Sequence, residues 1–115
     1  MIKKWRPKEV KKKMEPKKKE FKISMASLSN NKLIKREYRF VVEGPFDENK
    51  VEGFMMQIDG RRMAEVFEDS SIGYSAETLD NLTRFIAGSI RNKFADDAVL
   101  VSCYYEDRKS AFYMR

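Results

Sequence analysis

The sequence has 115 residues, of which 42% are hydrophobic and 12% aromatic, and its formal net charge is +6. This length and composition predict a single globular domain with a small core. A domain of this size buries only about two thirds of the surface of its unfolded chain, so we expect a homo-oligomer in which partners cover sheet edges. No apolar stretch approaches the roughly 20 residues that span a bilayer, and the charged N-terminus lacks the apolar region of a secretory signal. We therefore expect a cytoplasmic protein.

The sequence contains no histidine and one cysteine, Cys103. A single cysteine permits no internal disulfide, which agrees with a reducing compartment. Without imidazoles or a second thiol, tetrahedral zinc or iron–sulfur ligation within one chain is excluded, so we expect no metal and no cofactor. Cys103 lies in an apolar strand-like segment and is therefore interpreted as a buried structural thiol rather than a nucleophile.

The positive charge is concentrated at the N-terminus. The first 20 residues hold ten Lys or Arg and three Glu, whereas the remaining 95 hold 14 basic and 15 acidic residues. With Pro7 and Pro16 interrupting it, this composition predicts a flexible basic arm over residues 1–19, followed by a domain over residues 20–115. Such runs are usually solvated, mobile segments, and they are also the type of sequence that neutralises phosphates on nucleic acid or an anionic lipid surface. The candidate polyanion-binding residues are Lys3, Lys4, Trp5, Arg6, Lys8, Lys11, Lys12, Lys13, Lys17, Lys18 and Lys19, where Trp5 either docks on a subunit or stacks on a base.

The domain begins with two strand patterns. Alternating apolar residues predict strands over 21–28 and 33–43, joined by a turn at 29–32 and ended by Gly44-Pro45. In the second strand one face carries Tyr38, Phe40 and Val42, and the other carries Glu37, Arg39, Val41 and Glu43. We expect these two strands to form an antiparallel pair.

The middle of the chain predicts two helices. Residues 46–50 form a polar loop and 53–58 an apolar run too short for a full helix, after which Asp59 is placed to cap a helix that buries Met63, Val66 and Phe67. Ser75 is placed to cap the longest helix, with Glu77 in its first turn and an apolar stripe at Leu79, Leu82, Phe85, Ile86 and Ile90.

Two further strands complete the domain, over residues 99–106 and 110–115, with a turn at 107–109. The order is β-β-α-α-β-β. It predicts an α+β fold in which an antiparallel sheet carries two helices on one face and its edge strands pair between subunits.

Four local motifs occur in this order. They are Val42-Glu43-Gly44-Pro45-Phe46-Asp47, Gly53-Phe54-Met55-Met56-Gln57-Ile58, Tyr74-Ser75-Ala76-Glu77-Thr78-Leu79, and the stretch from Val99 to Glu106 followed by Ala111-Phe112-Tyr113. Over roughly residues 20–115 the chain thereby resembles the family of 6-pyruvoyl-tetrahydropterin and 6-carboxy-tetrahydropterin synthases, members of the tunnelling-fold group. The resemblance implies that fold and a symmetric ring of subunits.

The departures from the family pattern concern its chemistry. The stretches that match its three zinc histidines, residues 23–28 and 31–36, contain none, and the aspartate of the second motif falls on Gln57. The loop with a catalytic aspartate and histidine is shortened to Glu68-Asp69-Ser70-Ser71, and the loop with the catalytic cysteine is missing. Zinc-dependent pterin chemistry needs a Lewis acid and a positioned acid or base, so we expect no such enzyme.

A ring-binding element of the family has a counterpart here. A glutamate near the last hairpin accepts two hydrogen bonds from the N–H edge of a pterin or purine, and Glu106 is the closest match. Glu77 is the second candidate for binding the ring. The alternative for Glu106 is a turn carboxylate paired with Arg108 or Lys109, and the alternative for Glu77 is a charge in the first turn of a helix.

Two functions follow from these patterns. The first is a non-catalytic, oligomeric homologue, a pseudoenzyme, that binds a polyanion, most simply nucleic acid, through the Lys-rich segment. The second is a pterin- or purine-binding module that uses Glu106 in an intersubunit pocket. An enzyme that acts without a metal on such a ligand is a third and weaker alternative.

Overall fold

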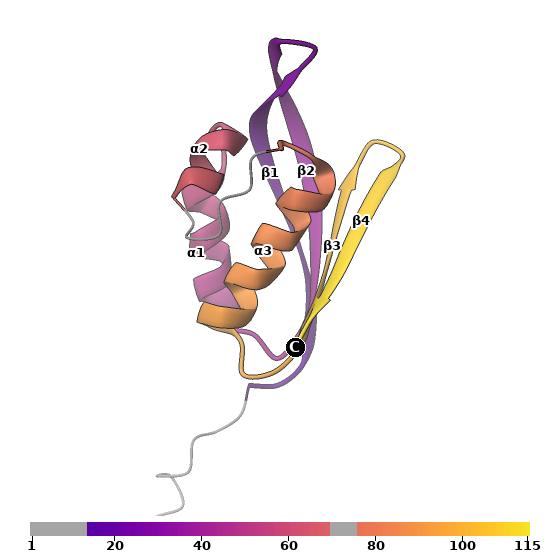
Figure 1. Cartoon of the computed structure of the whole chain (residues 1–115). Coiled ribbons are helices and arrows are strands. Elements are labelled where there is room, and N and C mark those ends of the chain that lie inside the picture. The colour runs from indigo at the N-terminus through magenta and orange to yellow at the C-terminus, as the bar shows by residue number, and fades with distance from the viewer. Residues whose placement is uncertain (1–13, 70–75) are drawn as a thin grey trace, which may run out of the picture.

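The computed structural model describes residues 14–69 and 76–115. Its elements are β1 (Lys17–Ser29), β2 (Lys32–Gly44), α1 (Glu48–Ile58), α2 (Met63–Glu68), α3 (Leu79–Phe94), β3 (Val99–Tyr105) and β4 (Arg108–Met114). The fold is α+β, as the sequence predicts. Figure 1 shows the helices gathered on one face of a single sheet, while the other face is left open.

The sheet has four strands in the order β1-β2-β3-β4, and every neighbouring pair is antiparallel. β1 and β2 pair along their whole length, from Lys17 opposite Gly44 to Ser29 opposite Lys32. β3 pairs only with the end of β2, from Arg39 to Glu43. The far part of the first hairpin therefore extends beyond β3 and β4 (Figure 1).

The turn of this hairpin fits its sequence. Asn30 and Asn31 have φ angles of 52° and 64°, and asparagine tolerates this left-handed region better than most residues do. Positive φ at both central residues matches the right-handed twist of the flanking strands. The predicted turn at 29–32 is confirmed.

The core lies between the sheet and the helices. Inward side chains of the strands, such as Met25, Phe40 and Val101, are fully buried against Val51 and Met55 of α1 and the stripe of α3. Leu82, Ile86 and Ile90 of that stripe are also fully buried. The predicted amphipathic stripe of the longest helix is therefore confirmed.

The number of helices differs from the prediction, because residues expected to form a polar loop and a short apolar run form α1. The helix begins after Asp47, whose side chain accepts a hydrogen bond from the Lys50 amide at 3.2 Å. Val51, Met55 and Ile58 recur at helical spacing and are buried. Burial of this stripe stabilises the helix although its sequence contains Gly53.

Two predicted helix caps are wrong. Asp59 ends α1 instead of capping α2, whose N-cap is Arg62, and the Asp59 carboxylate accepts a hydrogen bond from the Ser24 amide of β1 at 2.7 Å. The cap of α3 is Thr78, which accepts from the Asn81 amide at 3.1 Å. Ser75 lies outside the described residues, and Glu77 precedes the helix rather than forming part of its first turn.

The first strand begins earlier than the expected domain boundary at residue 20. Lys17, Lys18 and Lys19 belong to β1 and pair with Gly44, Glu43 and Val42. The Lys17 ammonium donates a hydrogen bond to the Phe46 carbonyl at 2.6 Å and lies over the Phe46 ring. These three lysines are therefore part of the sheet and not of a flexible arm.

Candidate functional site

The open face of the sheet, the face away from the helices, carries a mixed layer of charged, aromatic and small side chains. Its residues alternate along each strand with those that face the helices, because successive side chains point to opposite faces. The basic side chains outnumber the carboxylates: Lys18, Lys22, Lys35, Arg39 and Lys109 stand against Glu20, Glu37 and Glu43. Within this layer a shallow hollow is lined by residues of all four strands, including Lys18, Val41, Leu100, Ser102 and Tyr104.

Tyr104 lies at one end of this hollow, and Lys18, Glu43 and Leu100 line the other end. The register places Tyr104 opposite Arg39 of β2 and Lys109 of β4. The Arg39 guanidinium lies 4.2 Å from the centroid of the Tyr104 ring, and the Lys109 ammonium lies 5.5 Å from it. Both contacts are cation–π interactions, so two positively charged side chains lie against one aromatic ring on the open face.

Part of this charge is balanced. Glu20 pairs with Arg39 at 3.2 Å, and both side chains are nearly half exposed, so the pair contributes at most about 1 kcal/mol. Among the described residues, neither Lys18 nor Lys109 forms an ion pair. The hollow therefore combines an aromatic ring, over which the Lys109 ammonium lies, with the ammonium of Lys18, which has no ion pair among the described residues. This arrangement suits a planar ring that carries negative charge.

The predicted polyanion-binding residues are divided by the structure. Lys3, Lys4, Trp5, Arg6, Lys8, Lys11, Lys12 and Lys13 lie outside the described residues. Lys17 contacts Phe46, and Lys19 pairs with Glu48 of α1 at 3.0 Å, so both have structural partners on the helical side. Lys18 lines the hollow on the open face. Lys19 also borders this hollow, but its ammonium is held by Glu48, whereas Lys18 has no ion pair among the described residues.

The two glutamates of the ring-binding prediction lie near the same end of the fold. Glu106 occupies the β3–β4 turn, is exposed and has a φ of 54°. It is a turn residue, as its alternative role predicts, but among the described residues it forms no ion pair with Arg108 or Lys109. Glu77 precedes α3, and its Oε1 atom is buried without a hydrogen-bond partner in the described part of the chain. The residues next to them, Thr78 and Arg108, line one shared surface hollow.

The stretches expected to match the zinc histidines lie opposite each other in the first hairpin, where Met25 pairs with Arg36 and Leu28 with Leu33. Their side chains include no imidazole. Within residues 14–69 and 76–115 there is no cluster of His, Cys, Asp or Glu that could hold a metal ion. Gln57 lies exposed on α1, and Asp69 pairs with Arg61 at 2.9 Å.

The Cys103 thiol is fully buried on the helical side of β3. Burial raises its pKa to about 12, and a hydrogen bond with Thr83 offsets this rise only in part. A thiol with so high a pKa forms little thiolate at neutral pH. The predicted burial of Cys103 is confirmed.

The cluster of Tyr104, Arg39 and Lys109 was missed at the level of sequence. The stripe of Tyr104, Tyr105, Phe112 and Tyr113 indicates core or interface, and the structure splits it: Tyr105 and Phe112 pack against the core, whereas Tyr104 and Tyr113 point to the open face. The alternation of the strands contains this signal, but only the register of β2 with β3 brings Arg39 to the ring.

No family model, curated protein or solved structure matches this chain. In the described part of the chain, no helix is long and apolar enough to cross a membrane.

Proposed function

We propose that this protein is a non-catalytic, oligomeric homologue of the tetrahydropterin synthases that binds a polyanion, most simply a single strand of nucleic acid. The observation that carries the proposal is the geometry around Tyr104, whose ring is contacted by Arg39 and Lys109 on an open sheet face. Lys18 lines the same hollow and lies four residues after Met14, where the described chain begins. The described chain begins beside the loop between α3 and β3, where the Met14 amide donates a hydrogen bond to the Asp96 carboxylate at 2.8 Å.

The two parts have complementary roles. Lysines of the N-terminal segment neutralise phosphates without regard to sequence and release counterions, which gives a strong dependence on salt. On the open face, a base stacks against Tyr104 or on the Arg39 guanidinium while Lys18 and Lys109 contact the neighbouring phosphates. A ring of subunits would multiply both contributions by presenting several copies together.

Unpaired strand edges support the oligomer. β1 and β4 are the outer strands, and within residues 14–69 and 76–115 the edge of β2 from Leu33 to Tyr38 has no partner strand on the β3 side. The loop after α1 covers part of the β1 edge, because the Gly60 amide donates to the Ser24 carbonyl at 2.6 Å. β4 has no such cover among the described residues, which favours its pairing with another subunit.

The proposal is tested by fluorescence anisotropy with a labelled oligothymidine of about 20 nucleotides. Replacing Tyr104 by Leu removes the stacking surface and keeps an apolar side chain, and the expected result is about tenfold weaker binding. Lys50→Gln is the matched control, because Lys50 is exposed on α1 on the helical side and its loss should leave affinity within twofold. Equal affinities of the wild type and Tyr104→Leu would contradict binding of the single strand by the open face.

The second candidate is a pterin- or purine-binding module. It is favoured by the position of Glu106, a carboxylate that is exposed at the edge of the sheet and is not paired with its neighbours Arg108 and Lys109. Isothermal calorimetry with neopterin and guanine separates it from the first candidate, because Glu106→Gln should abolish the heat of ring binding and leave oligonucleotide binding unchanged. The absence of heat with both compounds would reject this candidate.

A further inference from the structure

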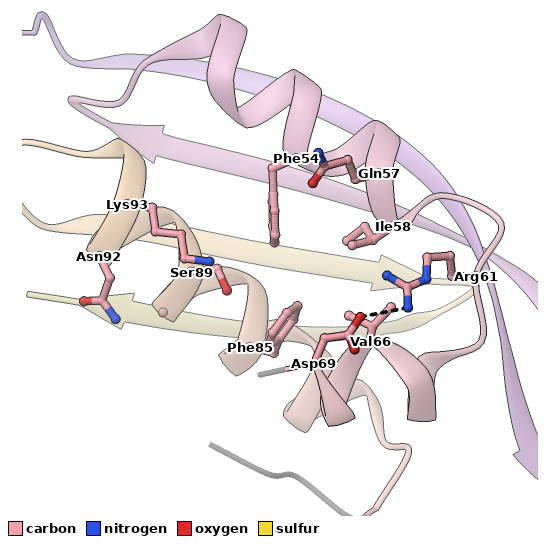
Figure 2. A pocket seen from close by; sticks show the side chains of 11 residues that line it. Phe54, Gln57, Ile58, Arg61, Val66, Asp69, Phe85, Ser89, Asn92 and Lys93 are labelled. Atoms are coloured by element: carbon pink, nitrogen blue, oxygen red, sulfur yellow. Dashed lines mark hydrogen bonds and ion pairs between the residues drawn. The ribbon is translucent and has the colours of Figure 1, made fainter. Parts of the chain in front are cut away.

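The helical layer contains a cleft that lies on the opposite side of the protein from the open face. It is formed by α1, α2 and α3, has a volume of about 380 Å³, and is open to solvent. Figure 2 shows side chains of all three helices converging on it. A volume of this size lies at the lower end of the range of roughly 300 to 1,000 Å³ that is usual for small-molecule pockets.

The floor of the cleft is apolar. Phe54 of α1 and Phe85 of α3 face each other with ring centroids 6.1 Å apart, and Ile58 and Val66 continue the surface. Phe54 also packs against Phe94, at 5.7 Å, so its ring is held from a second side. These contacts fix the aromatic floor before any ligand arrives, which reduces the entropy that binding would cost.

The rim of the cleft is polar and differs between its two ends. At one end Arg61 is neutralised by Asp69, at 2.9 Å. At the other end lies Lys93, which forms no ion pair among the described residues. Lys93 and Ser89 are four residues apart on α3 and line the same cleft, so they lie on one helix face. In Figure 2 the Lys93 ammonium and the Ser89 hydroxyl point to the same part of the cleft, beside the Phe54 ring.

We infer that this cleft binds a small amphipathic carboxylic acid, whose ring or short apolar body lies on Phe54 and Phe85. Its carboxylate accepts hydrogen bonds from the Lys93 ammonium and the Ser89 hydroxyl. The charge of Lys93 makes the first of these bonds the stronger one. A nucleotide fits poorly, because its several negative charges would meet a single unpaired cation.

The inference does not depend on the proposed function, since none of its residues belongs to the open face. The probe is 2-naphthoate, which has two fused rings and one carboxylate, and the neutral analogue is 2-naphthamide. Binding to the full chain is followed by amide chemical-shift changes. We expect 2-naphthoate to shift amides of α1 and α3 around Phe54 and Ser89, and to bind at least tenfold more tightly than 2-naphthamide.

Three variants complete the test. Lys93→Met should weaken 2-naphthoate at least tenfold and leave 2-naphthamide unchanged, whereas Lys93→Arg should retain binding within about threefold. Gln57→Trp, at an exposed position on the cleft, should block both compounds by filling it. Lys50→Met, on α1 outside the cleft, serves as the control. Shifts confined to the open face, equal affinities for acid and amide, or no binding of 2-naphthoate would each overturn the inference.

Discussion

Gly44 gives the sharpest test of how the end of β2 is built. Its φ is 139°, a backbone conformation that residues other than glycine rarely adopt. A Cβ atom added there would lie 2.7 Å from the Ala98 carbonyl oxygen and 3.2 Å from the Val99 Cα. Both are backbone atoms at the start of β3, so the clash is relieved only by moving that strand.

The size of the effect follows from two costs. Holding a non-glycine residue at such a φ costs about 1 to 3 kcal/mol, and displacing β3 from the buried Val99 adds a packing cost of about 1 to 3 kcal/mol. We therefore expect Gly44→Ala to lower the free energy of unfolding by about 2 to 6 kcal/mol. This is a large part of the stability of a small domain.

Substitutions at two other glycines distinguish the cost of the strained φ from the cost of the clash with β3. Gly60 has a φ of 84° but no atom within 4 Å of an added Cβ, so Gly60→Ala should lose only about 1 to 2 kcal/mol. Gly53 lies inside α1 with nothing within 4 Å, so Gly53→Ala should gain about 0.5 to 1 kcal/mol from helix propensity. Urea unfolding followed by circular dichroism measures all three. If Gly44→Ala is no more destabilising than Gly60→Ala, the close approach of β3 is refuted.

Three further predictions concern single side chains. Burial raises the pKa of Cys103 to about 12 and raises that of Tyr38, so both groups stay protonated in the fold at a pH where the unfolded chain has begun to release their protons. These two groups should therefore leave the free energy of unfolding unchanged below about pH 8 and lower it as the pH rises from about 9 to 12, with Cys103 contributing up to about 4 kcal/mol. Urea titrations at several pH values measure this. The prediction is contradicted if the free energy of unfolding of Cys103→Ala decreases with pH as steeply as that of the wild type. Glu106→Asn should raise the free energy of unfolding by about 0.5 to 1 kcal/mol, and with it the thermal midpoint, because asparagine tolerates the φ of 54° better than glutamate does. A lower thermal midpoint would count against this prediction. Asp47→Ala removes the cap of α1 and should cost about 1 kcal/mol in urea unfolding, whereas Asp47→Asn, which keeps an acceptor for the Lys50 amide, should cost much less; equal losses would argue against the cap.

Local sequence patterns predict most of this fold because they act over short distances. The alternation of Tyr38, Phe40 and Val42 identifies the buried face of β2, and Asn30-Asn31 marks the turn before it. The beginning of α1 was missed because Glu48 to Lys50 are polar and follow Gly44-Pro45. Val51, Met55 and Ile58 do show helical spacing, but their burial depends on contact with β1, which a local pattern does not contain.

The candidate site was harder to predict for a related reason. Arg39 and Tyr104 are far apart in the sequence and meet only because β2 pairs with β3 in a particular register. A shift of that register by one residue would turn Tyr104 toward the helices. The sequence indicated the basic segment and its final lysines, whereas the structure assigns Lys17 and Lys19 to contacts within the fold and Lys18 to the open face.

The binding of a single strand by the Lys-rich segment is tested most directly by its dependence on salt. The variant in which Lys3, Lys4, Lys8, Lys11, Lys12 and Lys13 are replaced by Gln keeps the full chain and leaves β1 intact. For the wild type, the logarithm of the affinity for oligothymidine should fall steeply with the logarithm of the salt concentration, by about 0.7 for each phosphate that is neutralised. The variant should show weaker binding and a clearly shallower slope. An unchanged slope and affinity would contradict polyanion binding by this segment.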